Sequence, residues 1–319
     1  MRLRRMHRWS VGLLVTFIAL GTLAEHRVAR ADEAPRVVAT IRPLHSLAAG
    51  VLAGVTTPYL LIDGPQSPHA FSLRPTGAGQ LQRADVVFMV GAGLAPALTD
   101  AVIPLARKAQ IAELAKAHGV QLLTVRDGED ENHRHGHETE HGHNADHETD
   151  PHIWLDPENA KAMVAAIVET MQRTDPQNAL RYRANGVALR QRLDALTLDI
   201  KAQLAPLKHR PFIVFHDAFQ YFEQRFGLAA VSALTSTPES RPGAFRANHI
   251  RRRIQELGKV CVFSEPGFQP KLISVLTEGT SARTAILDPL GINISPGLSL
   301  YFDMMRKNAQ VLADCLNKT

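Results

Sequence analysis

Cysteine is scarce in this chain of 319 residues, which contains only Cys261 and Cys315. Neither lies near the N-terminus, so the sequence offers no cysteine for the lipid modification of a bacterial lipoprotein, and we expect no lipid anchor. In an oxidising compartment the two cysteines can form a disulfide; the alternative is a pair of buried free thiols. The choice depends on whether the chain is exported.

Long hydrophobic runs are nearly absent. Residues 11–24 form a short apolar run, which is too short to span a membrane comfortably. A basic start precedes it and the small-residue sequence Ala29-Arg30-Ala31 follows it, which is the pattern of a secretory signal peptide. We therefore expect residues 1–31 to be a signal peptide cleaved near Ala31, with a membrane anchor as the alternative. Export in turn favours a disulfide between the two cysteines.

An excess of one charge sign is also lacking once this leader is set aside. The whole sequence has 36 basic and 31 acidic residues and a net charge of +5. Residues 1–31 hold six of the arginines and one of the acidic residues, which leaves 30 residues of each sign. The balance gives no indication of nucleic acid or an anionic membrane as a partner.

Short β-branched runs alternate with helical stretches from residue 36 onward. In the first half the pattern predicts strands at 37–41, 59–62, 86–90 and 121–125, and helices at 44–52, 77–83 and up to about 118. In the second half it predicts strands at 212–215, 229–231, 260–264 and 285–287, and helices at 218–226, 250–257, 272–278 and 300–316. Such alternation implies a parallel sheet in each half, so we predict two α/β lobes.

A long amphipathic stretch separates the two halves. Asp175-Pro176 has the features of a helix start, and apolar residues then recur at three- and four-residue spacing. A helix over 176–205 would be about 45 Å long. We expect segment 175–207 to link an N-terminal lobe, 32–174, to a C-terminal lobe, 208–319. The alternative is a plain helix on one lobe.

Residues 129–150 have an unusual composition, with histidines among Glu, Asp and Gly and no apolar periodicity. This composition predicts a mobile loop. Clusters of histidine and carboxylate on a loop bind divalent metals weakly and adaptably, so we predict auxiliary metal contacts; the alternative is a solvated polar loop. The six histidines are His133, His135, His137, His141, His143 and His147.

Four other residues lie where a rigid site could form. In open α/β sheets, ligands bind beyond the carboxyl ends of the strands. The four candidates lie in such segments or just before a helix start, two in each half, and are His69, His152, His216 and Asp288. Each alone could be a loop, capping or turn residue. As a set they predict one metal site between the lobes, with His45 and Glu265 as lesser candidates.

Five segments that contain these residues resemble the zinc-uptake branch of the cluster A-I solute-binding family of ABC importers. The segments are 68–75, 152–155, 215–218, 263–266 and 287–291. The histidine-rich acidic insertion before His152 is also typical of that branch, as are paired cysteines on a late strand and the terminal helix. The resemblance covers essentially the whole mature chain.

The resemblance implies two lobes, each with a mainly parallel sheet flanked by helices, joined by one long helix, with zinc in the cleft between them. By position it implies His69, His152 and His216 as imidazole ligands. Some members have a glutamate before the first of these, but this chain has Pro68, so Asp288 is the expected fourth ligand and water the alternative. Manganese-binding relatives carry a glutamate at the His216 position, so His216 favours zinc.

The resemblance also implies a binding protein, not an enzyme, because three imidazoles and a carboxylate leave no position for a catalytic water. The protein would capture Zn2+ with high affinity in the periplasm as a monomer and deliver it to the inner-membrane permease of an ABC-type zinc importer. An auxiliary periplasmic zinc chaperone is a further candidate partner. The alternatives are a secreted zinc-dependent hydrolase and a zinc-buffering or adhesin protein on the same fold. The sequence contains no Gly-x-Ser-x-Gly motif that would support hydrolytic chemistry.

Overall fold

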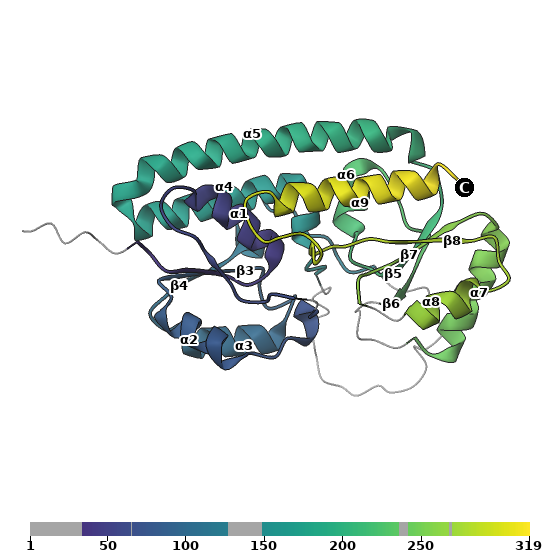
Figure 1. Cartoon of the computed structure of the whole chain (residues 1–319), viewed down its shortest axis with the longest axis horizontal. Coiled ribbons are helices and arrows are strands. Elements are labelled where there is room, and N and C mark those ends of the chain that lie inside the picture. The colour runs from purple at the N-terminus through teal and green to yellow at the C-terminus, as the bar shows by residue number, and fades with distance from the viewer. Residues whose placement is uncertain (1–33, 65, 127–148, 236–241, 268–269) are drawn as a thin grey trace, which may run out of the picture. The chain divides into compact units, whose positions relative to one another are not determined.

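A computed structural model describes residues 34–64, 66–126, 149–235, 242–267 and 270–319 (Figure 1). The chain divides into two compact units, 1–33 and 34–319, and all of the described residues belong to the second. The predicted signal peptide and the six histidines of the predicted loop lie outside the described residues. Among the helices that are described, none is long and apolar enough to cross a membrane.

The first sheet has four parallel strands in the order β2-β1-β3-β4. Its central strands β1 and β3 are short, fully buried apolar runs, as expected for a parallel sheet whose two faces are covered by helices. The elements in order are β1 Val37–Ala39, α1 Arg42–Leu52, β2 Tyr59–Leu60, α2 Pro75–Arg83, β3 Val86–Met89, α3 Pro96–Leu105 and β4 Gln110–Glu113.

The second sheet repeats this arrangement with four parallel strands in the order β6-β5-β7-β8. Every residue of its central strand β5 is buried. The elements in order are β5 Phe212–His216, α6 Gln220–Phe226, β6 Ser232–Thr235, α7 Ala244–Leu257, β7 Cys261–Ser264, α8 Pro270–Thr277 and β8 Arg283–Ile286. The predicted α/β fold with two parallel sheets is therefore confirmed.

Long helices pack together beside the two sheets (Figure 1). Helix α5, Ala179–Leu204, packs along α4, Pro157–Thr174, and both contact α1. Helix α9, Leu300–Leu316, packs on α5 and α1 and also contacts β8. The last helix therefore joins elements from both halves, and one hydrophobic core runs from Val37 to Leu316.

The predicted linking helix is present, with different ends. Residues Pro176–Asn178 and Ala205–Leu207 form single 3-10 turns, and the α-helix between them is α5. Its buried side chains include the apolar residues whose spacing predicted it, since that spacing places them on one face. The lobe boundaries at residues 174 and 208 stay a prediction.

The fourth strand of the first sheet was predicted at the wrong place. We expected a helical stretch to residue 118 and a strand at 121–125, but α3 ends at Leu105 and the fourth strand is β4. Near Thr124 there is only a single antiparallel bridge to Thr149. The sequence Gln-Ile-Ala-Glu of β4 has no strand-like alternation, and all four residues are half-buried. Pairing with β3 decides its conformation, which overrides local propensity.

Strand β6 was also misplaced, because we predicted it at 229–231 and it occupies Ser232–Thr235. Its register follows from pairing with β5, in which Ile213 lies opposite Ser232 and His216 opposite Thr235. Other elements keep the predicted type with shifted boundaries; the largest shift is in α7, which begins at Ala244 and not at residue 250. Helix α9 has the predicted bounds.

Cys261 at the start of β7 and Cys315 near the end of α9 form a disulfide, as the interpretation of an exported chain predicted. Their Cα atoms are 6.1 Å apart, within the usual range for such a bond. The bond fixes the last helix to a central strand of the second sheet.

Candidate metal centre

Three histidines from three separate segments converge on one point. His69 lies in the 3-10 turn Pro68–Ala70 after β2, His152 directly precedes the turn Ile153–Leu155, and His216 is the last residue of β5. One ring nitrogen of each lies within 4.8 Å of those of the other two. The structure therefore brings together all three residues that the sequence predicted as imidazole ligands.

Local structure fixes the segments that carry these rings. Ser67 Oγ accepts a hydrogen bond of 3.2 Å from the His69 backbone N–H, and Pro68 occupies the first position of the turn. Both features favour a helical turn at this point. The backbone N–H of His152 donates to Asp150 Oδ1 over 2.9 Å.

Two of the rings are oriented by buried carboxylates. Nδ1 of His152 donates to Asp150 Oδ1 over 2.7 Å, and Nδ1 of His216 donates to Glu265 Oε1 over 2.9 Å. A neutral ring that carries its proton on Nδ1 has a free lone pair on Nε2. This arrangement of carboxylate, histidine and metal is common in metalloproteins, where it fixes the tautomer and the ring orientation.

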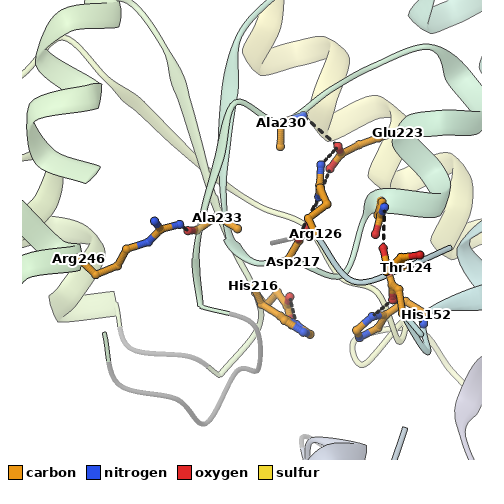
Figure 2. Close-up of polar contacts among 12 residues, drawn as sticks. Thr124, Arg126, His152, His216, Asp217, Glu223, Ala230, Ala233 and Arg246 are labelled. Carbon is orange, nitrogen blue, oxygen red and sulfur yellow. Dashed lines mark hydrogen bonds and ion pairs between the residues drawn. The ribbon is translucent and has the colours of Figure 1, made fainter. Parts of the chain in front are cut away.

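The Nε2 atoms point into a shared space, with His152 and His216 side by side in Figure 2 and ring centroids 4.8 Å apart. Nε2 of His152 is 3.2 Å from Nε2 of His69. Nε2 of His216 is buried and has no hydrogen-bond partner among the described residues. A buried polar nitrogen without a partner is unfavourable, and a cation at this point would satisfy it.

Burial also sets the charge of the site. It lowers the pKa of His152 well below its usual value, and the neighbouring His216 lowers that pKa further. His152 is therefore neutral at pH 7, which is the form that binds a metal. Burial raises the pKa of Asp150 to about 7, against the opposing effect of the His152 backbone N–H. A divalent cation nearby would favour the ionised carboxylate.

The space around the rings is small and largely apolar. It measures about 20 Å³, which is enough for at least one particle the size of a water molecule. Trp154 is held beside His152, with its Nε1–H donating to the Pro289 carbonyl over 2.7 Å. The residues around the space, besides the three histidines and Glu265, are Ser67, Pro68, Trp154, Pro266, Pro289, Leu290 and Ile292. Low polarity strengthens the attraction between a cation and its ligands.

The fourth predicted ligand, Asp288, is not brought into this group. It follows β8 as expected, but its Oδ1 accepts from the backbone N–H groups of Leu290 at 3.1 Å and Gly291 at 2.8 Å. It is neither one of the residues that surround the space nor one of the three that gather there. Its role as a ligand stays a prediction, and these bonds give it a structural role in the loop after β8.

The two lesser candidates have different outcomes. His45 lies in α1, and its Nε2 donates to the Pro58 carbonyl over 3.0 Å, so it is separate from the group. Glu265 borders the space and contacts His216, which makes it an orienting residue. Asp150 has the same role at His152, and sequence reasoning missed it. The sequence Asp150-Pro151-His152 was the signal that could have shown it, because the Asp-x-His spacing allows this local hydrogen bond.

Comparisons with known proteins show the family of this chain. The family model described as "Zinc-uptake complex component A periplasmic" matches residues 37–315. The chain is 41% identical over 312 residues to the "High-affinity zinc uptake system protein ZnuA" of Brucella suis, covering 90% of this chain and 93% of that protein. It is 38% identical over 320 residues to the protein of the same name from Paracoccus denitrificans, covering 95% and 97%.

Solved structures show the same fold. A crystal structure of ZnuA superimposes with a TM-score of 0.76 at 22% identity and covers 89% of this chain and 100% of its own. A zinc-bound deletion mutant of ZnuA gives a TM-score of 0.74 at 22% identity, with 89% and 98% covered. The family model extends over nearly the whole described chain, and the relatives match over most of their length. On this evidence the chain belongs to the family of the periplasmic zinc-uptake complex component A.

Proposed function

We propose that this protein captures Zn2+ with high affinity in the periplasm and delivers it to an ABC-type zinc importer. The observation that carries the proposal is the convergence of three imidazoles, one of which has a buried Nε2 without a partner among the described residues. The relatives named above are zinc-uptake proteins. Zinc is the cargo here, so the site must hold the ion tightly and still release it to the permease.

In this proposal the ion has four ligands. Three are the Nε2 atoms of His69, His152 and His216, and the fourth is a water molecule. Asp288 would have to give up hydrogen bonds to backbone N–H groups, among them those of Leu290 and Gly291, to reach the ion. Imidazole suits zinc, whereas sites for manganese are built mainly from carboxylate and water oxygens. The protein should therefore prefer Zn2+ to Mn2+.

The proposed location follows from the family and the leader. Residues 1–31 would be removed near Ala31, and the mature protein would act as a monomer that meets the inner-membrane permease. An auxiliary periplasmic zinc chaperone would be a second partner. The balanced charge of the mature chain does not indicate nucleic acid or an anionic membrane as a further partner.

A secreted zinc hydrolase is the weaker alternative. Residues 137–141 read His-Glu-Thr-Glu-His and so match the spacing of a zinc-protease motif. They lie outside the described residues, in a segment without the apolar periodicity of the helix that carries this motif in such enzymes. At the described site, both neighbouring carboxylates hold the histidine rings, which is a ligand-orienting role and not that of a general base for a hydrolytic water. This arrangement favours binding over hydrolysis.

The function can be tested by growth. A bacterial strain that lacks its own periplasmic zinc-binding protein, but retains the permease and ATPase, would express this chain in medium with a zinc chelator. We expect restored growth and restored zinc uptake, and no restoration by His216→Ala. If the purified protein binds zinc tightly but never restores uptake, buffering or adhesion is the better assignment.

The orienting carboxylates lead to a prediction. Glu265→Gln and Asp150→Asn should each weaken zinc binding about 10- to 100-fold, which is the usual cost of losing an outer-shell partner of a ligand. The amides keep the shape but lose the charge that stabilises the imidazole–metal unit. Competition with a fluorescent chelator measures the affinity. Glu256→Gln, on the exposed ion pair with Arg253, is the control and should have no effect. Unchanged binding in both site variants would refute the orienting role.

The histidine-rich segment leads to a second prediction. Deleting residues 129–146 should preserve one tight zinc site per chain, because the three ligands and both orienting carboxylates lie outside the deletion. Weaker additional binding should disappear, since flexible ligands lose conformational freedom when they bind. Calorimetry on the intact and deleted proteins separates the two phases. Loss of the tight phase with survival of the weak one would place the principal site in the deleted segment.

A further inference from the structure

Arg126 joins two buried carboxylates close to the metal centre. Its Nε donates to Asp217 Oδ2 over 2.9 Å, and Nη2 donates to the other oxygen of the same carboxylate. Its Nη1 donates to Glu223 Oε2 over 2.7 Å (Figure 2). The Asp217 and Glu223 side chains are only 14% and 4% exposed. Each would be a costly buried charge without the guanidinium.

Asp217 directly follows the proposed ligand His216 at the end of β5. Its backbone N–H donates to the Thr235 carbonyl of β6 over 3.2 Å, and its side chain is held by Arg126. Arg126 thereby adds a second restraint, on the side chain, to the residue next to His216. The Asp217 carboxylate makes two parallel bonds to the guanidinium, which restricts its orientation more than a single bond would.

The segment that carries Arg126 is also hydrogen-bonded to Asp150, the residue beside the second proposed ligand, His152. The Tyr221 hydroxyl of α6 accepts from the Leu123 N–H over 3.0 Å and donates to the Asp150 carbonyl over 2.8 Å. The Asp150 N–H in turn donates to the Leu123 carbonyl over 2.8 Å. Asp150 is the residue that orients His152. Residues 123–126 therefore connect the support of His152 with the support of His216.

From these contacts we propose that Arg126 is a positioning residue for zinc binding. By holding Asp217 and Glu223, it keeps His216 at the distance from His152 that one zinc ion requires. The inference rests on the proposed function, since it assumes that the three histidines bind zinc. It assigns Arg126 no contact with the ion.

The test compares Arg126→Met with Arg225→Met. Arg225 lies in α6 and makes two hydrogen bonds, both 2.7 Å, to the Asp156 carboxylate. Asp156 caps α4 and touches none of the three histidines in the described contacts. Both variants remove an arginine that joins the first half of the chain to the second, but Arg126 bonds two carboxylates and Arg225 bonds one. The free energy of unfolding of each metal-free variant is therefore measured alongside, which separates a loss of stability from a loss of zinc affinity. Only Arg126→Met removes the restraint next to His216.

We expect Arg126→Met to weaken zinc binding about 10- to 100-fold, the range for a lost outer-shell partner, and Arg126→Lys to have an intermediate effect. Arg225→Met should bind zinc as the unaltered protein does. Affinity would be measured by chelator competition at a temperature where each metal-free variant is folded. The visible absorption spectrum of the Co2+-loaded protein reports ligand geometry, and it should change in Arg126→Met and not in Arg225→Met.

Each outcome decides the inference. Normal affinity and a normal Co2+ spectrum in Arg126→Met would overturn it, as would equal losses in both variants. If Arg126→Met does not fold, Arg126→Lys and Asp217→Asn replace it, and normal binding by both would equally overturn the inference. A failure of the proposed function has a different signature, because the unaltered protein and His216→Ala would then bind zinc equally weakly.

Discussion

His216→Ala is expected to weaken zinc binding by more than the roughly 100-fold that the loss of an outer-shell partner can cost, because it removes a ligand itself. His216 Nε2 is buried and aimed at the common space, and its ring is already oriented by Glu265. In the unaltered protein the ligand therefore needs little reorganisation to bind. Substitution also leaves the Glu265 carboxylate buried without its histidine partner, which adds to the loss.

Two measurements check this expectation. Chelator competition gives the affinity directly. Thermal unfolding gives a second estimate, because a ligand at 1,000 times its dissociation constant adds about 4 kcal/mol to the free energy of unfolding. The added stability should be nearly absent in His216→Ala at the same zinc concentration. The control is His249→Ala, because His249 lies in α7 and is not one of the three grouped histidines. Equal losses from the two substitutions would show that the site has been assigned to the wrong residues.

Loss of the disulfide is expected to have the second large effect. Cys261 and Cys315 are separated by 54 residues, and closing a loop of that length stabilises the folded chain by about 4 kcal/mol in the chain-entropy model. Reduction should lower the melting temperature and loosen α9 first, since the bond is that helix's covalent link to β7. Zinc affinity should change much less, because neither cysteine is among the residues around the metal space.

Denaturant unfolding with and without reductant measures the effect. The double substitution Cys261→Ala and Cys315→Ala is the matched control: it should resemble the reduced protein, and reductant should not change it further. Thiol titration of protein purified from the periplasm without reductant should find no free thiol. Two reactive thiols there would mean that the bond is not formed in the cell.

The fold class, and three histidines that the structure brings together, could be predicted from the sequence. Four consecutive buried apolar residues made β3 recognisable, and the three- and four-residue spacing along α5 identified its buried face. These signals are local, because a strand or helix shows its period within its own residues. The three histidines were predicted for a related reason. They lie near the ends of strands or the start of a helix, where ligands of α/β proteins bind, and are His69, His152 and His216.

The sequence could not place β4 or show which carboxylate contacts His216. Both questions depend on which strands are neighbours. β4 has no local strand pattern and becomes a strand by pairing with β3.

Glu265 and Asp288 each follow a strand of the second sheet, and we predicted Asp288 as the fourth ligand. The strand order β6-β5-β7-β8 determines which of the two carboxylates contacts His216. Glu265 follows β7, which is hydrogen-bonded to β5, and so it reaches His216 at the end of β5. Asp288 follows β8, one strand further away, and strands in a sheet are spaced by about 4.8 Å. Strand order arises from the packing of the whole sheet, so only the tertiary structure could show which carboxylate lies beside the histidine.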